Sequence, residues 1–440
     1  MNRWRYVFAG VYVLLISAGL ICSCGGGGGD GDVAEATVFG IILDSNSDPV
    51  SGALVTITSD PVTTITNIDG EFSAEVEVGE HTITVTVGNS TVYADSLSVP
   101  DESPVDLGDL TPDPATPFFQ MTEASVAGTY FMGIIDVDPD DLDPDGASVA
   151  VVAEMDGDGS LLYEVLSNSS GDTESGSGTF SVAADGGLSV DGAPGESPYR
   201  GQVSPDGSIF CYVDTDITGD EIALAFGVIQ SSGMDESAFA GTYIMAQLGV
   251  GDGSEVWSLG VRIEADGEGN LFYQSMSNPM DSGFGTYSVD GEDGSITIVG
   301  ETDAYAQLSP DGNVLLFVDT SVDAHVAVGV RQPSGMSQSD LTGIYHFVAF
   351  AFNDEDISTS AAARGDLISD GAGNVGISFL EVSDGDPETA SDTVTMEDDG
   401  TMTTSGGMIG QISWDGGIFG FPDVSEDTDD SLFFVGIRKP

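Results

Sequence analysis

The chain has 440 residues, of which 74 are Asp or Glu and 8 are Lys or Arg, so its formal net charge at pH 7 is −66. A surface this acidic repels nucleic-acid phosphates and anionic lipid headgroups, so neither is expected as a partner. With 40% apolar residues, a chain of this length has material for several hydrophobic cores.

The first 23 residues predict a secretory signal. Arg3 and Arg5 are the only charged residues before Asp30, and a nearly unbroken apolar run extends from Val7 to Ile21. This run is shorter than the roughly 20 apolar residues that a membrane-spanning helix needs. A cleaved signal is therefore favoured over an N-terminal transmembrane anchor.

The end of this segment resembles a bacterial lipoprotein signal, because Ile21 stands three positions before Cys24 and the small Ser23 directly precedes it. The resemblance implies that residues 1–23 are removed as a lipoprotein signal peptide and that Cys24 is lipidated. The protein would then be exported and lipid-anchored, at the outer membrane or cell surface. The Gly-rich residues 24–35 would form a flexible tether.

The mature chain predicted in this way is strongly acidic and has one cysteine beyond the tether. Its formal charge is −68, because cleavage removes two arginines and no acid. Cys211 is the only cysteine beyond the tether, so no disulfide framework is available and each domain depends on its hydrophobic core.

Short alternating strands bounded by Gly and Asp-Gly turns predict an all-β protein, and residues 36–100 form its first domain. Alternation places Val55 and Ile57 on one face, and turns at Asp69-Gly70 and Gly79 predict two hairpins. The domain resembles the carboxypeptidase regulatory-like family, which implies a transthyretin-like (Ig-like) β-sandwich without catalytic activity. The resemblance is carried by Gly40, Asp44, Pro49-Val50, Gly52-Ala53, Val55, Asp69 to Phe72 and Gly79.

The peptidase that accompanies such a domain in that family is not encoded in this sequence. A zinc carboxypeptidase needs a His with a Glu three residues later, and His81, His325 and His346 all lack that Glu. Residues 101–122, rich in proline and acids, are expected to be a stiff linker.

The rest of the chain is one unit written three times, over residues 123–232, 236–334 and 338–440. The copies open with AGTYFM, AGTYIM and TGIYHF, continue through GQVSPDG, AQLSPDG and GQISWDG, and close with AFGVIQ, AVGVRQ and FVGIRK. Repetition this regular decides the fold. Each copy is expected to have its own core, with exposed linkers near 231–238 and 333–340.

Each copy has about eight predicted strands, which fits two architectures. The first is three repeated eight-stranded up-and-down β-barrels, and the alternative is a six-bladed β-propeller with two blades per copy. Because each signature occurs once per copy and the halves of a copy differ, barrels are favoured. Tyr243 and Tyr345 on first strands, with Arg331 and Arg438 on last strands, resemble the lipocalin and avidin arrangement, although the first copy has Ile229 in place of arginine.

The recurring residues have structural interpretations. Tyr130, Tyr243 and Tyr345 are expected to plug one end of each barrel. The aspartates that recur in the Asp-Gly turns are interpreted as turn formers, and they are Asp206, Asp311 and Asp415.

One acidic loop offers a candidate metal site. Asp141, Asp143 and Asp145, followed by Gly146, match the opening of a calcium-binding loop, in which carboxylates at alternate positions converge on one ion. The twelfth position is Val152 rather than an acid, so the alternative is a solvated acidic loop. No cofactor other than this calcium ion is expected.

The sequence shows no nucleophile–base pair, no Gly-x-Ser-x-Gly elbow and no phosphate-binding loop. We therefore expect a non-catalytic surface protein with a binding or structural role, anchored to the membrane by its lipid. Its repeated β modules would bind a polysaccharide or a protein. One alternative is a small-ligand carrier that uses the barrel interiors, and another is a hydrolase if the repeats form a propeller.

Overall fold

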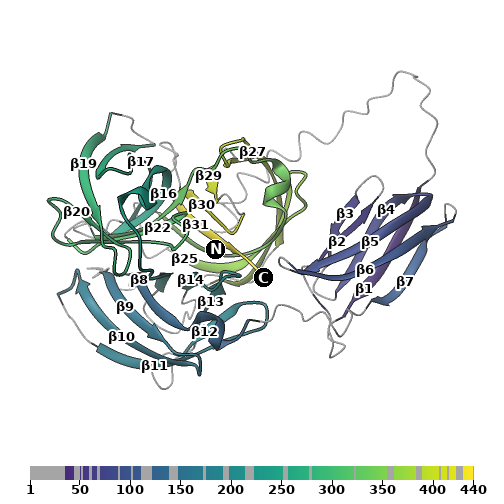
Figure 1. Ribbon diagram of the computed structural model, residues 1–440, viewed down its shortest axis with the longest axis horizontal. Helices are drawn as coiled ribbons and strands as arrows, with labels where there is room; N and C mark the ends of the chain where they lie inside the picture. The colour runs from purple at the N-terminus through teal and green to yellow at the C-terminus, as the bar shows by residue number, and fades with distance from the viewer. Residues whose placement is uncertain are drawn as a thin grey trace. The chain divides into compact units, whose positions relative to one another are not determined.

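The computed structural model is all-β apart from three short 3₁₀ helices within the residues that it describes (Figure 1). These residues are 35–43, 50, 53–58, 62–66, 70–87, 90–100, 103–110, 121–137, 147–171, 175–191, 198–213, 222–250, 256–276, 280–321, 324–353, 361–382, 389–405, 408–413, 416–422 and 430–439. They form two compact units, an N-terminal unit up to Leu110 and a second unit over residues 121–438.

The N-terminal unit is a β-sandwich, as predicted. Its strands are β1 (Glu35–Ile42), β2 (Leu54–Thr58), β3 (Val62–Ile65), β4 (Glu71–Glu77), β5 (Gly79–Val87), β6 (Ser90–Val99) and β7 (Val105–Leu110). One sheet has the order β4-β1-β7 and the other the order β3-β2-β5-β6. Val38 and Phe72 from the first sheet pack against Val55, Ile57 and Val85 from the second.

The two hairpins predicted at Gly70 and Gly79 are wrong. β4 follows Gly70 but pairs with β1, and β5 begins at Gly79 but pairs with β2 and β6. Both glycines therefore stand where the chain passes from one sheet to the other. Gly70 has a positive φ of 73°, which is typical of a tight turn. The glycine therefore marks the turn correctly, but it does not show which sheet the next strand joins.

Each sequence repeat folds into a closed eight-stranded barrel. The first contains β8 (Gly128–Val137), β9 (Ala147–Met155), β10 (Ser160–Asn168), β11 (Ser175–Val182), β12 (Gly187–Val190), β13 (Tyr199–Val203), β14 (Ile209–Val213) and β15 (Ile222–Ile229). The second contains β16 (Gly241–Val250), β17 (Val256–Ala265), β18 (Asn270–Ser275), β19 (Ser282–Val289), β20 (Ser295–Ile298), β21 (Ala304–Leu308), β22 (Val314–Asp319) and β23 (Ala324–Arg331). The third contains β24 (Gly343–Asn353), β25 (Ala361–Ser369), β26 (Asn374–Val382), β27 (Thr389–Met396), β28 (Thr401–Thr404), β29 (Ile409–Ile412), β30 (Ile418–Pro422) and β31 (Asp430–Arg438).

These barrels have the up-and-down topology that the sequence predicted. Consecutive strands pair antiparallel, and the first strand of each copy pairs with the last, β8 with β15, β16 with β23 and β24 with β31. A propeller would instead split each copy into two open four-stranded blades. The propeller alternative is therefore wrong.

Strand alternation builds a separate core inside each barrel. On β8, Tyr130 and Met132 belong to the interior cluster of the first barrel, while Phe131 belongs to a different cluster outside it. The second and third barrels have equivalent interior clusters around Tyr243 and Tyr345. This part of the expectation, a core for every copy, agrees with the structure.

A fourth core, which the sequence analysis did not predict, joins the outer walls of all three barrels. It contains Phe226 from the first barrel, Leu248 and Val328 from the second, and Phe350 and Phe433 from the third, all almost fully buried. Each copy therefore has its own core, and the three copies also pack against one another through this shared core. Their outer walls carry too much apolar surface to remain in water.

The contacts run head to tail around a closed ring (Figure 1). β8 and β9 contact β22 and β23, β16 and β17 contact β30 and β31, and β24 and β25 contact β14. In each of these contacts, the first strands of one barrel pack against later strands of another barrel. This is the heterologous contact that closes a cyclic oligomer, here within one chain.

The chain between copies is tied to the barrel that follows it. The Ser231 and Gly233 amides donate to the carbonyls of Asp293 and Gly291, and the Met336 amide donates to the Asp398 carbonyl. These backbone hydrogen bonds tie the segments after the first and second barrels to the next barrel. Ser232, Gly233, Ser334 and Gly335 in these segments are exposed, and the linkers stay a prediction.

Candidate functional site

Three repeated features meet at one end of each barrel, called here the closed end. They are a 3₁₀ helix before the first strand, the tyrosine on that strand, and the Asp-Gly turn between the sixth and seventh strands. The helices are η1 (Glu123–Val126), η2 (Glu236–Phe239) and η3 (Gln338–Leu341). The Tyr130 hydroxyl donates to the Gly207 carbonyl at 2.5 Å, and the Tyr243 hydroxyl donates to the Gly312 carbonyl at 2.6 Å.

This geometry makes the recurring tyrosines barrel plugs. Tyr130, Tyr243 and Tyr345 are each fully buried. Burial raises the pKa of Tyr130 and Tyr243 far above the usual range, so both hydroxyls remain protonated donors. All three tyrosines therefore belong to the barrel cores, and Tyr130 and Tyr243 also hydrogen-bond to the Asp-Gly turn.

The Asp-Gly turns are structural as well. The Asp206 carboxylate accepts from the Ser204 hydroxyl at 2.6 Å and from the Ser208 amide at 3.0 Å. Asp311 accepts in the same way from the Ser309 hydroxyl, at 2.6 Å, and from the Asn313 amide, at 3.1 Å. These bonds close the turn locally. Asp415 lies outside the described residues.

Close packing explains why glycine follows those aspartates. At Gly312, where φ is 73°, a Cβ atom would lie 2.8 Å from the Ala238 carbonyl oxygen of η2. At Gly416, where φ is 68°, it would lie 2.7 Å from the Asp340 carbonyl oxygen of η3. Glycine alone fits both the dihedral angle and the space.

Arg331 and Arg438 also belong to the closed end. Their strand registers place them opposite Tyr243 and Tyr345. Ile229 takes the equivalent position opposite Tyr130 in the first barrel. The arrangement suggested by the lipocalin and avidin resemblance is therefore present in the second and third barrels, where it forms part of the plug.

Sequence reasoning missed a third repeated polar residue, the buried glutamine of the sixth strand. The Nε2 atoms of Gln202, Gln307 and Gln411 donate to the carbonyls of Asp185, Asp293 and Asp399 at 2.7–2.8 Å. Each bond ties the sixth strand to the turn between the fourth and fifth strands. The signal was visible, because a glutamine stands two residues before every Ser-x-Asp-Gly turn.

The candidate calcium ligands Asp141, Asp143 and Asp145 lie outside the described residues, as does the candidate lipidation site Cys24. Within the described ranges, no group of three or more His, Cys, Asp or Glu side chains is arranged to hold a metal ion. The same part of the chain contains no helix that is long and apolar enough to span a membrane. Calcium binding and lipidation therefore remain predictions.

The described interiors of the barrels are occupied by their own side chains. In the second barrel, the Trp257 ring lies against Gly249, where a Cβ atom would clash with it. His325 stands between Trp257 and Phe317, with ring-centroid distances of 5.4 and 5.3 Å. In the third barrel, Phe347 stacks on Phe434 at 4.5 Å.

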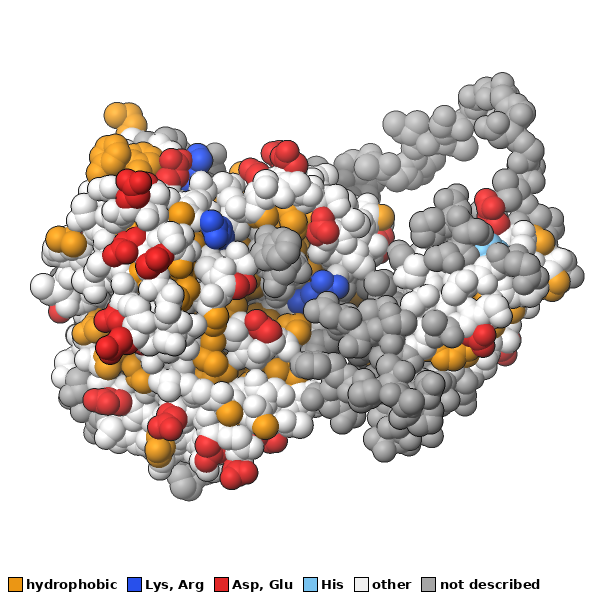
Figure 2. All heavy atoms as spheres, viewed as in Figure 1, with side chains coloured by type: hydrophobic (Ala, Val, Ile, Leu, Met, Phe, Trp, Pro, Cys, Tyr) orange, Lys and Arg blue, Asp and Glu red, His pale blue; other side chains and the backbone are white. Residues whose placement is uncertain are grey.

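The outer wall of the second barrel carries the most exposed large apolar side chains of the described chain. Its apolar residues are Phe272, Met280, Phe284 and Val299, called here the aromatic wall. Met280, Phe284 and Val299 are 92%, 87% and 66% exposed, and no other described large apolar side chain is as exposed. In Figure 2, apolar side chains gather at the upper left, over the region where Figure 1 places β19.

The strand register holds this wall together. Phe272 on β18 and Phe284 on β19 are directly paired, and their ring centroids lie 5.0 Å apart. The Val299 amide donates to the Thr286 carbonyl, which places Val299 beside the same strand. Such clustering is informative because soluble proteins rarely leave adjoining large apolar side chains in water without a use for them.

Comparison of the repeats shows that the aromatic wall is specific to the second copy. The pair Phe272–Phe284 corresponds in strand register to Leu162–Ser177 in the first barrel and to Gly376–Ser391 in the third. The fold therefore does not need two phenylalanines at these positions. Residues that a scaffold does not require are the natural candidates for a binding role.

Three exposed acids lie close to the residues of the aromatic wall in sequence or strand register. Asp281 directly follows Met280, Glu301 lies two residues after Val299, and Glu264 is paired with Phe272 in strand register. One cation lies on this wall within the described residues, Arg262, and it forms an ion pair with Glu264 at 2.8 Å. The wall therefore has an apolar centre and an acidic rim.

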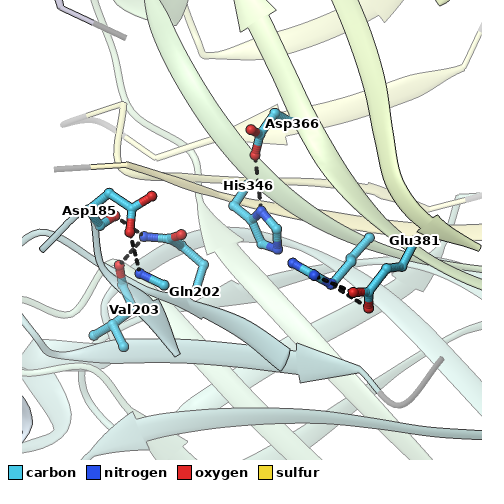
Figure 3. Close-up of polar contacts among 8 residues, drawn as sticks. Asp185, Gln202, Val203, His346, Asp366 and Glu381 are labelled. Atoms are coloured by element: carbon cyan, nitrogen blue, oxygen red, sulfur yellow. Dashed lines mark hydrogen bonds and ion pairs between the residues drawn. The ribbon is translucent and has the colours of Figure 1, made fainter. Parts of the chain in front are cut away.

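A second polar cluster lies between the first and third barrels. Arg364 contacts Glu381 through two hydrogen bonds of 2.9 and 2.6 Å, and Arg200 of the first barrel reaches the same carboxylate at 3.9 Å. His346 Nδ1 lies 3.0 Å from Asp366 Oδ1 (Figure 3). These charges lie at the contact between barrels, so we assign them to ring assembly.

No family model matches this chain, and no similar curated protein was found. Solved structures align with it at low TM-scores, among them the following three. A double mutant of Transferrin Binding Protein B from Haemophilus parasuis is 9% identical over 95% of this chain and 97% of that chain, with a TM-score of 0.22. A DUF3823 family protein from Parabacteroides merdae is 15% identical over 45% of this chain and 99% of that chain, with a TM-score of 0.18.

The third structure, a DUF3598 family protein of unknown function from Nostoc punctiforme, is 8% identical over 48% of this chain and 99% of that chain, with a TM-score of 0.18. TM-scores this low establish neither a shared fold nor a shared function. The resemblance of the N-terminal unit to carboxypeptidase regulatory-like domains stays a resemblance.

Proposed function

We propose that this protein is a non-catalytic binding protein, exported and held at the outer membrane or cell surface by a lipid on Cys24. The aromatic wall of the second barrel is its binding face. The observation that carries the proposal is that Met280, Phe284 and Val299, the three most exposed large apolar side chains among the described residues, all lie within two residues of β19 or β20 or on these strands. Exposed aromatic and Met side chains are typical of the centres of protein interfaces.

The ring of barrels supports a binding role. The shared core holds the second barrel on both sides, so its aromatic wall is presented from a fixed framework. Binding to a pre-organised face avoids the entropic cost of ordering that face. The recurrent tyrosines, aspartates and glutamines whose hydrogen bonds the structure describes are used by the fold. This supports a role that does not need them as catalytic groups.

The proposal can be tested with a photo-crosslinking amino acid at position 284 in the producing cells, with position 177 as the matched control. Ser177 occupies the corresponding place opposite Leu162 in the first barrel. We expect a crosslinked adduct from position 284. Added purified wild-type protein should suppress this adduct by competing for the partner, and added Phe272→Ser/Phe284→Ser variant should not. Equal adducts from both positions, or none from position 284, would contradict the proposal.

A further inference from the structure

The charged residues near the aromatic wall indicate the chemical class of its partner, and this inference rests on the proposed function. We infer that the partner is a polypeptide surface with an apolar centre and a rim of Lys or Arg. The apolar centre follows from the exposed Phe284, Met280 and Val299, which lose contact with water when a partner covers them.

The basic rim follows from the acids Glu264, Asp281 and Glu301. All three are exposed: Glu264 is paired with Phe272 in strand register and forms an ion pair with Arg262, and Asp281 and Glu301 lie within two residues of Met280 and Val299. An acidic or neutral partner would leave the carboxylates of Asp281 and Glu301 partly desolvated without a basic group from the partner. A basic partner compensates them, and the overall charge of −66 speeds its approach.

The same charges disfavour the other occupants of an apolar face. A second copy of this chain would place two acidic rims against each other, and an anionic membrane would meet the rim with like charge. A neutral polysaccharide would use the aromatic rings without using the acids. A basic polypeptide is the occupant that uses both the rings and the rim.

Synthetic peptides test this inference on the full mature protein. The probes are three 12-residue peptides of alternating leucine with lysine, glutamine or glutamate, each labelled with a fluorophore. The variants are Phe272→Ser/Phe284→Ser and, as a matched control, Leu162→Ser/Leu166→Ser on the outer wall of the first barrel. None of these substitutions changes the net charge, so general attraction to an acidic protein is the same in all.

We expect the lysine peptide to bind wild-type protein more tightly than the glutamine peptide, and the glutamate peptide to bind least. The Phe272→Ser/Phe284→Ser variant should lose at least about tenfold in affinity for the lysine peptide, and the control variant less than about twofold. Asp281→Asn with Glu301→Gln should weaken the lysine peptide alone. Added salt should do the same, because it screens exposed charges.

Several results would overturn the inference. One is equal binding of the lysine peptide to wild type and the Phe272→Ser/Phe284→Ser variant, which would show only diffuse attraction. Others are glutamine-peptide binding as tight as lysine-peptide binding, or wall-dependent binding of cellohexaose, of phosphatidylcholine vesicles or of a second copy of the chain. If the crosslink at position 284 persists in any of these cases, the proposed function stands and the partner class is wrong.

Discussion

Phe226 of the first barrel and Phe433 of the third lie edge to face, with ring centroids 5.8 Å apart. The two residues are 207 positions apart in sequence, yet both belong to the core shared by all three barrels. Their contact closes the ring, because the third copy returns to the first. The barrels are therefore packed together rather than held apart, and substitutions at their contacts are expected to lower the stability of the whole unit.

The contact between the first two barrels depends on a glycine. A Cβ atom at Gly133 on β8 would lie 2.6 Å from Val318 Cγ2 on β22. We predict that Gly133→Val lowers the free energy of unfolding by about 1–3 kcal/mol, as overpacking does in other cores. Denaturant unfolding measures this loss.

Gly376 is the matched control for that substitution, because it is also a strand glycine and a Cβ atom there meets nothing within 4 Å. Gly376→Val should change the free energy of unfolding by less than about 0.5 kcal/mol, as ordinary surface substitutions do. Equal effects at both positions would show that Gly133 is not a point of contact between barrels.

The closed-end hydrogen bonds are expected to stabilise each barrel. Tyr243→Phe removes the hydroxyl that donates to the Gly312 carbonyl and leaves that carbonyl without this donor. We predict a loss of about 1–2 kcal/mol in the free energy of unfolding. Tyr273→Phe is the control, because Tyr273 is 42% exposed, and it should change stability little. A similar loss for both variants would argue against the plug.

The ion pair between Arg364 on β25 and Glu381 on β26 is expected to contribute modestly to the stability of the third barrel, since both residues belong to that barrel. Glu381 is 38% exposed and Arg364 is 15% exposed, so solvent screens the pair in part. A double-mutant cycle with Arg364→Met and Glu381→Gln should give a coupling energy of about 1 kcal/mol, since the pair is bidentate but not deeply buried. The coupling should shrink in 1 M salt, and a coupling of zero at low salt would show that this pair does not stabilise the third barrel.

Lipidation of Cys24 is a separate prediction, based on sequence alone. Mass spectrometry of the mature protein should find a chain that begins at a diacylated or triacylated Cys24. Cys24→Ser should abolish the lipid and release the protein from the membrane fraction. Retention of residues 1–23, or an unmodified Cys24 in the wild-type protein, would refute the anchor.

The barrels could be predicted from the sequence because side chains on each strand alternate between the barrel interior and the outside. The recurrence of Tyr130, Tyr243 and Tyr345 set the number of copies, and single signatures per copy separated barrels from blades. The buried glutamines were missed because a polar residue in an alternating pattern reads as exposed. Only the structure shows that Gln307 donates its Nε2 hydrogen to the Asp293 carbonyl.

The shared core had a signal in the sequence that alternation obscured. IFCYV in β14 is buried at all five positions, and a strand without alternation is typically covered on both faces. The aromatic wall had no such signal. Phe284 lies between two glycines in GFG, and pattern alone cannot distinguish an exposed phenylalanine from a core one.

The reactivity of Cys211 tests most directly the claim that the three barrels are one unit. This thiol is fully buried in the shared core, and burial raises its pKa to about 12, so little reactive thiolate is present at pH 8. A chain that begins at residue 30 has Cys211 as its only cysteine, so labelling with a thiol reagent reports on this core alone. We predict that labelling under increasing denaturant follows the same transition as the loss of β-structure measured by circular dichroism. Rapid labelling in native buffer, or at denaturant concentrations well below that transition, would contradict a single cooperative ring of barrels.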